Sequence, residues 1–568
     1  MPPETNPQDM MLPGEIAQRV QAALARMQEE GWTERVWRED AHLWRDEPDH
    51  VEEISTRLGW LQLPVRVMPE LPKLTSIAQQ ARGEFERVVL LGMGGSSLAP
   101  WCFAEILGAA EGYPELVVLD STVPADVLAA TGGTSIDRCL FIVSSKSGTT
   151  TETLSAFEHF WQETVAAVGE RTAGNHFIVI TDPDTPLAEL ARARGARAIF
   201  ANWADIGGRY SGLSYFGLAP AALIGAPVQR MVELASEMAG ACVPEVPAEQ
   251  NPGAVLGALL GVCHEMGRDK VTFLTGPRLA SFGDWAEQLL AESTGKEGKG
   301  LVPVVGESPL EIAAYGADRL FVYVRQSGDG THDAMAEALA AAGHPVVRIE
   351  VDDAQSIGAE MFRWEFATAI AGAIMGIDPF DQPNVQEAKD RTKEVLAEFS
   401  RPGRLPEQEA DVVEGALGVF GSASGDVRGA IARLIDRIEP GDYFAIMAYL
   451  PRGEAVEDAV GRMRAAIAET RGVATTFGYG PRFLHSTGQL HKGGPNTGVF
   501  LQITAQHTDD VPIPGADYDF ATLVAAQAAG DFAALQAHDR RVLRVDLGDA
   551  WPENLGRLAE MTSDAAQA

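Results

Sequence analysis

The chain has 568 residues, of which 46% are apolar and 22% charged, so it is long enough for two or three globular domains. Its formal net charge of −35 disfavours nucleic acids and anionic membrane surfaces as partners, because an acidic field repels both. The four cysteines lie far apart and form no metal-type pair, so we expect free thiols in a reducing compartment.

The N-terminal region predicts a helical segment over residues 1–60. Ile16, Val20, Leu24 and Met27 lie on one stripe of the first predicted helix, which indicates that it docks on a neighbouring element. The first residues lack the basic and apolar regions of a secretion signal, and no later run is apolar enough to span a bilayer. We therefore expect a cytoplasmic protein without a membrane partner.

Short apolar runs alternate with helical patterns from about Arg87 onwards. This alternation is typical of parallel sheets that helices cover on both faces. The runs fall into two series, which favour two doubly wound α/β domains over one very large sheet. The first series is RVVLLG, LVVLD, RCLFIVSS, HFIVIT and RAIF, and the second is KVTFLTG, DRLFVYVR and PVVRIEV.

Changes in composition predict the domain boundaries. We assign residues 61–245 to the first domain and residues 246–398 to the first part of the second. The segment 399–438 opens with a stretch rich in Gly, Pro, Ser and acidic residues, so we expect a surface excursion there. Residues 439–568 contain further strand-like runs and are expected to complete the second domain.

A glycine-rich turn, GMGGSS, follows the first apolar run of the first domain. Free backbone N–H groups in such a turn, at the start of a helix, can bind an anion. The pattern departs from a dinucleotide fingerprint because Ser97 stands at the third glycine position, and no Walker lysine follows. NAD and ATP are therefore poorly supported, and we predict no cofactor.

A second turn, SSKSGTTTET, is rich in hydroxyl side chains and precedes a helix with apolar Leu154, Phe157 and Phe160. The structural alternative is an ordinary helix cap, for which one hydroxyl at Thr150 or Thr151 would suffice. The larger number of hydroxyls favours a cradle for a phosphate or carboxylate. Because both turns follow neighbouring strands of one sheet, they should converge on one ligand, most simply a phosphorylated small molecule.

Several separate blocks of the sequence resemble glucose-6-phosphate isomerases. The blocks are GMGGSSLAP, SSKSGTTTET, DIGGRYS, AEQLLAESTGKEGKGLVP, DPFDQPNVQEAK and FLHSTGQLHKGGP. They extend from Gly92 to Pro495, so coincidence is a poor explanation. More narrowly, the chain is similar to the isomerase half of bifunctional transaldolase/glucose-6-phosphate isomerase fusions. The residues ahead of the first sheet are too few for a transaldolase barrel.

The resemblance implies two sugar-isomerase (SIS) domains, each an α/β/α sandwich, with the active site between them. It implies the reversible isomerisation of glucose 6-phosphate and fructose 6-phosphate through an enediol(ate). That reaction requires a base to move a proton between carbon-1 and carbon-2, an acid to open the ring and a cation to stabilise the enediolate. The family is usually dimeric, so the resemblance also implies a homodimer, in which the histidine can come from the partner subunit.

Glu292 is the predicted base. Gln288, a predicted substrate-binding residue, lies four positions earlier on the same helical face, and Gly295 is typical of the end of a helix. From the local sequence alone, a solvated surface glutamate is the commoner interpretation. The match of ESTGK to the family's base motif reverses that preference.

The resemblance implies catalytic roles for two basic residues. Arg209 lies in GGRYS and is expected to stabilise the enediolate, the alternative being a surface salt bridge. Lys389 closes FDQPNVQEAK and is expected to contact the ring-oxygen region and to assist ring opening. Lys393, one turn later, is expected to be its solvated neighbour.

Two histidines are candidates for the acid that opens the ring. His485 lies in LHSTGQ, a motif that follows the glutamate closely in compact bacterial isomerases but here follows Lys389. The resemblance favours His485, although the order in animal-type isomerases would favour His491. No carboxylate or cysteine set accompanies either histidine in the sequence, so we predict no metal.

The two turns supply the predicted phosphate contacts. The resemblance implies binding by Ser145, Lys146, Ser147, Thr150, Gly95 and Ser96. Neutral directional donors and one lysine would hold a dianion that the field of so acidic a protein repels. Two alternatives stay open: a non-catalytic sugar-phosphate sensor, which would need no base, and an isomerase that also accepts mannose 6-phosphate.

Overall fold

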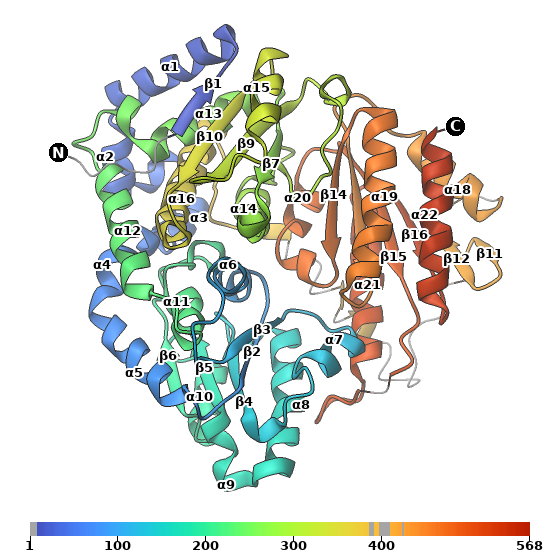
Figure 1. Cartoon of the computed structure of the whole chain (residues 1–568). Helices are drawn as coiled ribbons and strands as arrows, with labels where there is room; N and C mark the ends of the chain where they lie inside the picture. Colours follow the sequence, from blue (N-terminus) through green and yellow to red (C-terminus); the bar gives the residue numbers. More distant parts are fainter. Residues whose placement is uncertain are drawn as a thin grey trace.

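The computed structural model describes residues 8–384, 391–392, 394–396, 409–422, 425–509 and 511–567. Its strands form three sheets, of five, five and six strands (Figure 1). The first sheet lies at the bottom of that view, the second at the upper left and the third at the right. The predicted α/β class with parallel, helix-covered sheets is confirmed.

All five strands of the first sheet are parallel. Their order is β3 (Glu115–Leu119), β2 (Arg87–Gly92), β4 (Cys139–Ser144), β5 (Phe177–Thr181) and β6 (Ala198–Ala201). In chain order this is a 2-1-3-4-5 arrangement, so the winding reverses between β2 and β4. Doubly wound sheets bind ligands at such a reversal. The glycine turn follows β2 and the hydroxyl-rich turn follows β4, so both lie there.

The second sheet is parallel except for one edge strand. Its order is β1 (Gln8–Met11), β10 (Val346–Val351), β9 (Arg319–Gln326), β7 (Lys270–Thr275) and β8 (Val302–Val304). The edge strand β1 is antiparallel to β10. It lies within residues 1–60, where the sequence predicted helices and no strand. The other four strands repeat the 2-1-3-4 order of the first sheet.

The third sheet corrects the prediction for residues 439–568. Its order is β11 (Val412–Glu414), β12 (Leu417–Phe420), β16 (Arg541–Asp546), β15 (Gly498–Thr504), β13 (Tyr443–Tyr449) and β14 (Ala474–Tyr479). Strands β13 to β16 pair with one another instead of completing the second sheet, and they again show the 2-1-3-4 order. Apolar runs predict strands but do not encode which strands pair, so sequence alone did not separate the two sheets.

The segment 399–438 also differs from the predicted surface excursion. In its described part, β11 and β12 form an antiparallel hairpin on the edge of the third sheet. Helix α18 (Val427–Ile435) follows and buries Val427, Ile431 and Leu434 in the core of that sheet. These residues therefore belong to the third folding unit.

Helices fill the connections of all three sheets. Before and around the first sheet are α1 (Gly14–Glu29), α2 (Trp32–Trp37), α3 (Pro48–Ser55), α4 (Leu63–Arg66), α5 (Leu71–Ala81), α6 (Leu98–Leu107), α7 (Pro124–Ala129), α8 (Thr151–Val168), α9 (Glu170–Ala173) and α10 (Pro186–Ala193). Between the first two sheets and around the second are α11 (Tyr215–Leu223), α12 (Val228–Ala241), α13 (Pro252–Glu265), α14 (Ala280–Thr294), α15 (Asp333–Ala341) and α16 (Ile357–Met375). The third sheet adds α19 (Glu454–Arg471), α20 (Gly488–Gly493), α21 (Phe520–Ala537) and α22 (Trp551–Gln567).

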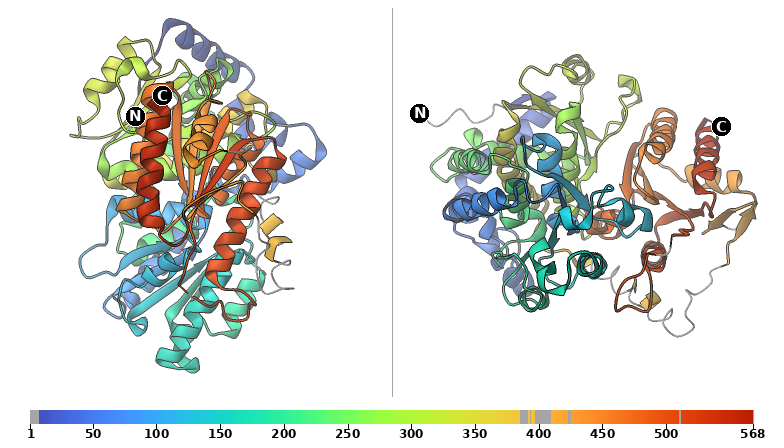
Figure 2. Two further views of the ribbon diagram at one scale, coloured as in Figure 1. Left: turned by 90° about the vertical axis from the view of Figure 1, so that its right-hand side faces the viewer. Right: turned by 60° about the horizontal axis from the view of Figure 1, so that its bottom comes forward.

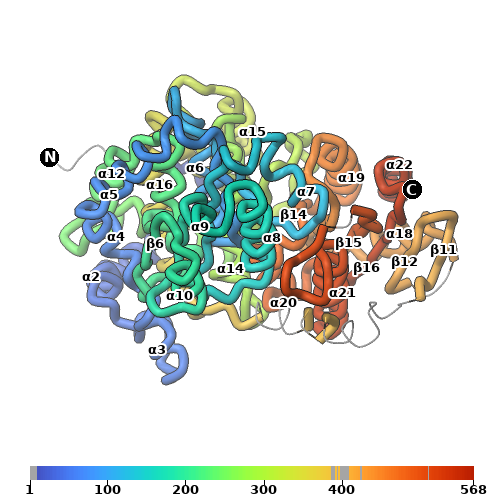
Figure 3. Tube along the Cα trace, turned by 90° about the horizontal axis from the view of Figure 1, so that it is seen from below, coloured from blue at the N-terminus to red at the C-terminus, as the bar shows by residue number. Residues whose placement is uncertain are grey.

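The third sheet packs against both of the others. One of its faces shares a core with α14 and β8, in which Ala291 and Val302 lie with Tyr443, Met447 and Phe483. Helices α18, α19 and α22 cover the other face. Helix α21 reaches the first sheet and lies beside α8, as the view from below shows (Figure 3). The third unit is thereby held along one side of the other two (Figure 2).

Two smaller predictions concern burial. The predicted stripe of α1, comprising Ile16, Val20, Leu24 and Met27, is buried, which confirms that this helix docks on its neighbours. All four cysteines are buried and unpaired, and burial raises the pKa of each thiol. Within the described part of the chain, no helix combines the length and apolarity that crossing a bilayer requires.

Candidate active site

The hydroxyl-rich turn lies at the N-terminus of α8. Thr150 occupies the N-cap position, but its hydroxyl accepts no hydrogen bond from the first turn of the helix in the described structure. It lies 2.9 Å from the Ser145 hydroxyl, while the Ser147 and Thr149 hydroxyls are 3.0 Å apart. The backbone donors at the start of α8 are therefore not used by a side-chain cap, as an anion-binding helix terminus requires.

Lys146 points away from this turn. Its ammonium group donates to the Asp182 carboxylate and, at 3.1 Å, to the carbonyl of Ala204. The Asp182 carboxylate balances the charge of Lys146, and the two contacts use two of the three N–H groups of its ammonium. The predicted contact of Lys146 with a phosphate stays a prediction.

The glycine turn after β2 is the meeting point of three segments. Gly94 has a φ of +55°, and a Cβ there would lie 2.8 Å from the carbonyl oxygen of His485 and 3.0 Å from the amide nitrogen of Gln288. A Cβ on Gly95 would lie 2.1 Å from the carbonyl oxygen of Gly208, next to Arg209. Both glycines are needed for these close approaches, which bring the predicted catalytic residues together.

Replacing Gly95 with alanine should therefore distort the site. The added methyl group meets backbone rather than a flexible side chain, so we expect a loss of about 1–3 kcal/mol in stability and a strong loss of turnover. Gly207→Ala is the matched control, because a Cβ there makes only ordinary contacts, the nearest at 3.8 Å. Thermal unfolding and steady-state kinetics of both variants test this. Equal behaviour of the two variants would contradict the packing argument.

Helix α14 presents Gln288 and Glu292 to the site, and it ends at Thr294 with Gly295 as its C-cap, as predicted. The amide nitrogen of Gln288 donates to the Glu292 carboxylate at 2.9 Å and to the carbonyl oxygen of His485 at 2.9 Å. Gln288 thus orients the Glu292 carboxylate and ties α14 to the segment that carries His485. Glu292 is 8% exposed, so the protein shields most of its side chain from solvent.

Arg209 is almost completely buried and fully oriented. Its Nε donates to the Ser293 hydroxyl at 2.7 Å, and its Nη1 donates to the Gln382 side chain at 2.7 Å and lies 3.6 Å from the Glu292 carboxylate. Its Nη2 donates to the carbonyls of Pro379 and Asp381. A guanidinium fixed in this way stabilises charge without having to reorganise during a reaction.

A charged network holds the turn that receives Arg209. The Lys296 ammonium donates to the Asp381 backbone carbonyl at 2.6 Å and to its carboxylate. The His50 Nδ1 lies 3.1 Å from the carboxylate of Asp378, which is fully buried. His50, Asp378 and Asp381 offer atoms within 4.8 Å of one another, a grouping that could hold a metal ion. The Lys296 ammonium on Asp381 already supplies a positive charge there.

His485 reaches the site from the third unit and contacts a residue that sequence reasoning missed. Its Nε2 lies 3.1 Å from the carboxylate of Glu152, in the first turn of α8. The Gln527 amide donates to the same carboxylate oxygen at 2.7 Å, and the Thr122 hydroxyl donates to Gln527 at 2.6 Å. Glu152 therefore orients a histidine 333 positions later. Its only sequence signal is its place in the quoted SSKSGTTTET block.

His491 occupies a different environment. It is 4% exposed, and its ring packs against the rings of Tyr443, Phe483 and Phe500. Burial holds the pKa of His491 well below its usual value, so this imidazole is neutral. The structure thus brings His485, and not His491, beside the other predicted site residues.

The remaining predicted basic residues, Lys389 and Lys393, lie outside the described residues. The chain just before them does approach the site. Gln382 accepts from Arg209, and the Asn384 backbone N–H donates to the Gln489 side chain at 2.9 Å. Sequence reasoning also missed Gln382 as a partner of Arg209, although it lies in the quoted DPFDQPNVQEAK block.

The chain was compared with known families and proteins. The phosphoglucose isomerase family model matches residues 73–302, which include the two turns, Arg209 and Glu292. Glucose-6-phosphate isomerase of Parabacteroides distasonis is 28% identical over 403 residues, covering 62% of this chain and 89% of that protein. Glucose-6-phosphate isomerase of Lactobacillus helveticus is 27% identical over 393 residues, covering 61% and 87%.

Two solved structures superpose on part of the chain. A Thermus thermophilus protein described only as hypothetical superposes with a TM-score of 0.58 at 26% identity, covering 68% of this chain and all of that one. The glucose-6-phosphate isomerase of Chlamydia trachomatis superposes with a TM-score of 0.50 at 18% identity, covering 65% and 78%, which speaks for the fold alone.

Proposed function

We infer that this chain belongs to the glucose-6-phosphate isomerase family and interconverts glucose 6-phosphate and fructose 6-phosphate. The observation that carries this conclusion is the grouping of a carboxylate, a fixed guanidinium and a histidine–glutamate pair beside two anion-ready turns. A base, a cation and an acid are the groups that an aldose–ketose isomerisation through an enediol(ate) requires.

The proposed mechanism begins with binding of the phosphate at the two turns. Backbone donors and hydroxyls from Gly95, Ser96, Ser145, Ser147 and Thr150 replace its hydration shell. The fold already holds these protein donors in place, so the dianion can bind despite the acidic field of the whole protein.

Ring opening follows, with His485 as the acid. The Glu152 carboxylate orients its imidazole, which gives a proton to the sugar ring oxygen while the bond between that oxygen and the anomeric carbon breaks and the anomeric hydroxyl loses its proton. Lys389 is proposed to assist this step, as the family resemblance implies.

Glu292 then moves the proton between the two carbons. Its carboxylate takes the proton from carbon-2 of the open-chain aldose, and the electron pair of that C–H bond forms the enediolate. Arg209 stabilises the negative charge that develops on the carbon-1 oxygen. A proton then passes from the carbon-2 hydroxyl to the carbon-1 oxygen, and Glu292 returns its proton to carbon-1, which gives the ketose. Gln288 keeps the carboxylate in position throughout.

Several finer points remain proposals. The chain is proposed to work as a homodimer in the cytoplasm and to resemble most closely the isomerase half of the transaldolase fusions. His485 reaches the site from the same chain as Glu292, so the site geometry itself does not demand a partner subunit. Whether mannose 6-phosphate is also accepted depends on pocket shape.

The direct test is turnover of fructose 6-phosphate by the wild-type protein, coupled to glucose-6-phosphate dehydrogenase. We expect steady production of glucose 6-phosphate and the reverse reaction when the other sugar phosphate is supplied. Tight binding of fructose 6-phosphate without turnover would instead support the alternative function, a non-catalytic sugar-phosphate sensor. The presence of Glu292 and Arg209 beside the turns speaks against that alternative, because a sensor needs no base.

A further inference from the structure

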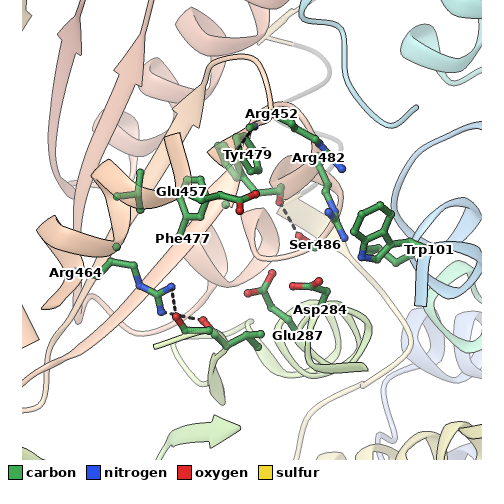
Figure 4. Close-up of a pocket in the computed structure, with 18 residues that line it drawn as sticks. Trp101, Asp284, Glu287, Arg452, Glu457, Arg464, Phe477, Tyr479, Arg482 and Ser486 are labelled. Atoms are coloured by element: carbon green, nitrogen blue, oxygen red, sulfur yellow. Dashed lines mark hydrogen bonds between the residues drawn. The ribbon is translucent and has the colours of Figure 1, made fainter. Parts of the chain in front are cut away.

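A cavity of about 560 Å³ lies where the three units meet (Figure 4). It is lined by α6, α14, the end of β8, α19, β14 and the segment around Ser486. Its size is within the range of small-molecule sites in proteins. Glu292, Arg209 and the phosphate turns do not line it, so it is distinct from the proposed active site. Two residues that line the cavity are direct sequence neighbours of proposed site residues: Glu287 precedes Gln288, and Ser486 follows His485.

Both acidic and basic side chains face this cavity. Asp284 and Glu287 project from α14 towards Arg482 and Ser486 (Figure 4). Arg452 and Arg464 lie on the facing walls, and Glu457 lies at the exposed rim.

Two of these side chains have unused hydrogen-bonding capacity. The Nη2 of Arg482 is buried and has no hydrogen-bond partner among the residues that the structure describes. The carboxyl group of Glu287 likewise has no hydrogen-bond partner in the described chain, although it faces the cavity. A buried polar atom such as this Nη2 is normally satisfied, by water if not by protein, and the partly exposed carboxyl of Glu287 is open to a partner in the cavity. A ligand that both donates and accepts hydrogen bonds would satisfy them.

The positive and negative charges around the cavity nearly balance, which limits the net charge of a ligand that could bind there. Asp120 lies behind the wall and pairs with both Arg452 and Arg482. Burial and the nearby Asp284 raise the pKa of Glu287 to about 8, so at neutral pH this carboxyl keeps its proton and can donate a hydrogen bond. A strongly charged ligand of either sign would meet like charges here, whereas a neutral ligand would not.

Apolar side chains supply the rest of the wall. Phe477, Leu98, Val305 and Val460 line the cavity, and Tyr479 lies beside Arg452. Carboxyl groups and guanidinium groups that exchange hydrogen bonds with hydroxyls, next to apolar and aromatic surface for C–H groups, suit a hydroxyl-rich molecule. We propose that this cavity is a second binding site, for a neutral sugar or polyol.

Binding of D-glucose and of D-sorbitol, as a ring sugar and an open-chain polyol, tests this proposal. Ligand-observed saturation-transfer NMR would be run in the presence of saturating fructose 6-phosphate, which occupies the proposed active site. We expect saturable binding of at least one probe with a Kd of about 1–10 mM, as is usual for so small a ligand. Comparing the affinities of the two probes shows whether the cavity prefers a ring sugar or an open-chain polyol.

Gly461→Leu should fill the cavity. A Cβ on Gly461, in α19, would meet no atom within 4 Å, and the residue lines the cavity, so the larger side chain has room to enter it. Gly556→Leu in α22 is the matched control, because a Cβ there also meets nothing within 4 Å and the residue does not line the cavity. We expect Gly461→Leu to weaken probe binding at least about tenfold and Gly556→Leu to leave it unchanged, an effect of ~1.4 kcal/mol or more.

Three results would overturn the proposal: no saturable binding to the wild type, full binding by Gly461→Leu, or loss of binding when fructose 6-phosphate is added. If Gly461→Leu does not fold, as judged by thermal unfolding, Glu287→Leu removes the unpaired carboxyl and gives the same prediction. Binding of a neutral probe does not require turnover, so failure here is distinct from failure of the proposed isomerase activity.

Discussion

Glu292→Gln should lower kcat for fructose 6-phosphate by about 10²–10⁴-fold, because it removes the base and keeps the size of the side chain. Gln288 and Arg209 would still position the new amide, so we expect KM to change much less than kcat. The measurements are the coupled assay and the exchange of a carbon-1 proton of fructose 6-phosphate with deuterium from the solvent. Both should fall together, since one group performs the transfer.

Glu337→Gln provides the control for this variant. Glu337 is an exposed residue of α15, and the same chemical change there should leave kcat and proton exchange at wild-type values. Unfolding temperature and sugar-phosphate affinity should be retained in both variants. Proton exchange that continues at the wild-type rate in Glu292→Gln would assign the base to another residue.

His485→Gln should separate ring opening from proton transfer. Glutamine can keep a hydrogen bond to Glu152, but its side-chain amide cannot act as a general acid, so we expect kcat on fructose 6-phosphate to fall by about 10²–10⁴-fold. An open-chain four-carbon aldose phosphate cannot form a ring and needs no opening. Its carbon-2 proton exchange should therefore be nearly unaffected in His485→Gln and lost in Glu292→Gln.

The control for this variant is His42→Gln, since His42 is an exposed histidine near the N-terminal helices. It should behave as the wild type with both substrates. If His485→Gln slowed the open-chain and the ring substrate equally, His485 would belong to the proton-transfer step or to the general integrity of the site.

The sequence predicted the parallel strands and the two ligand turns well, because these depend on local patterns. The apolar runs of the sequence indicated β2 and β4, and the turns that follow these strands lie at the winding reversal of the first sheet. The third sheet was missed because pairing between strands is a long-range property. Its strands have the same local pattern as those of the second sheet, and only the pairing of strands in the folded chain separates the two sheets.

The candidate site was predicted in part. Glu292, Gln288, Arg209 and His485 lie together, while the Lys146 side chain turns to Asp182, a partner on a different loop. Glu152 was missed because its relevance comes from a contact across 333 positions, which no spacing in the sequence displays. Sequence motifs thus identified the residues of the site, but only the tertiary structure shows which atoms each side chain contacts.

The place of His485 in the third unit has a consequence for protein synthesis. The first two sheets precede the third along the chain, and domains generally fold as units in the order in which the ribosome releases them. A nascent chain would complete the two turns and Glu292 well before His485, the proposed ring-opening histidine. A product truncated ahead of the third sheet would lack that histidine, and α14 and β8 would lose the apolar core that they share with this sheet.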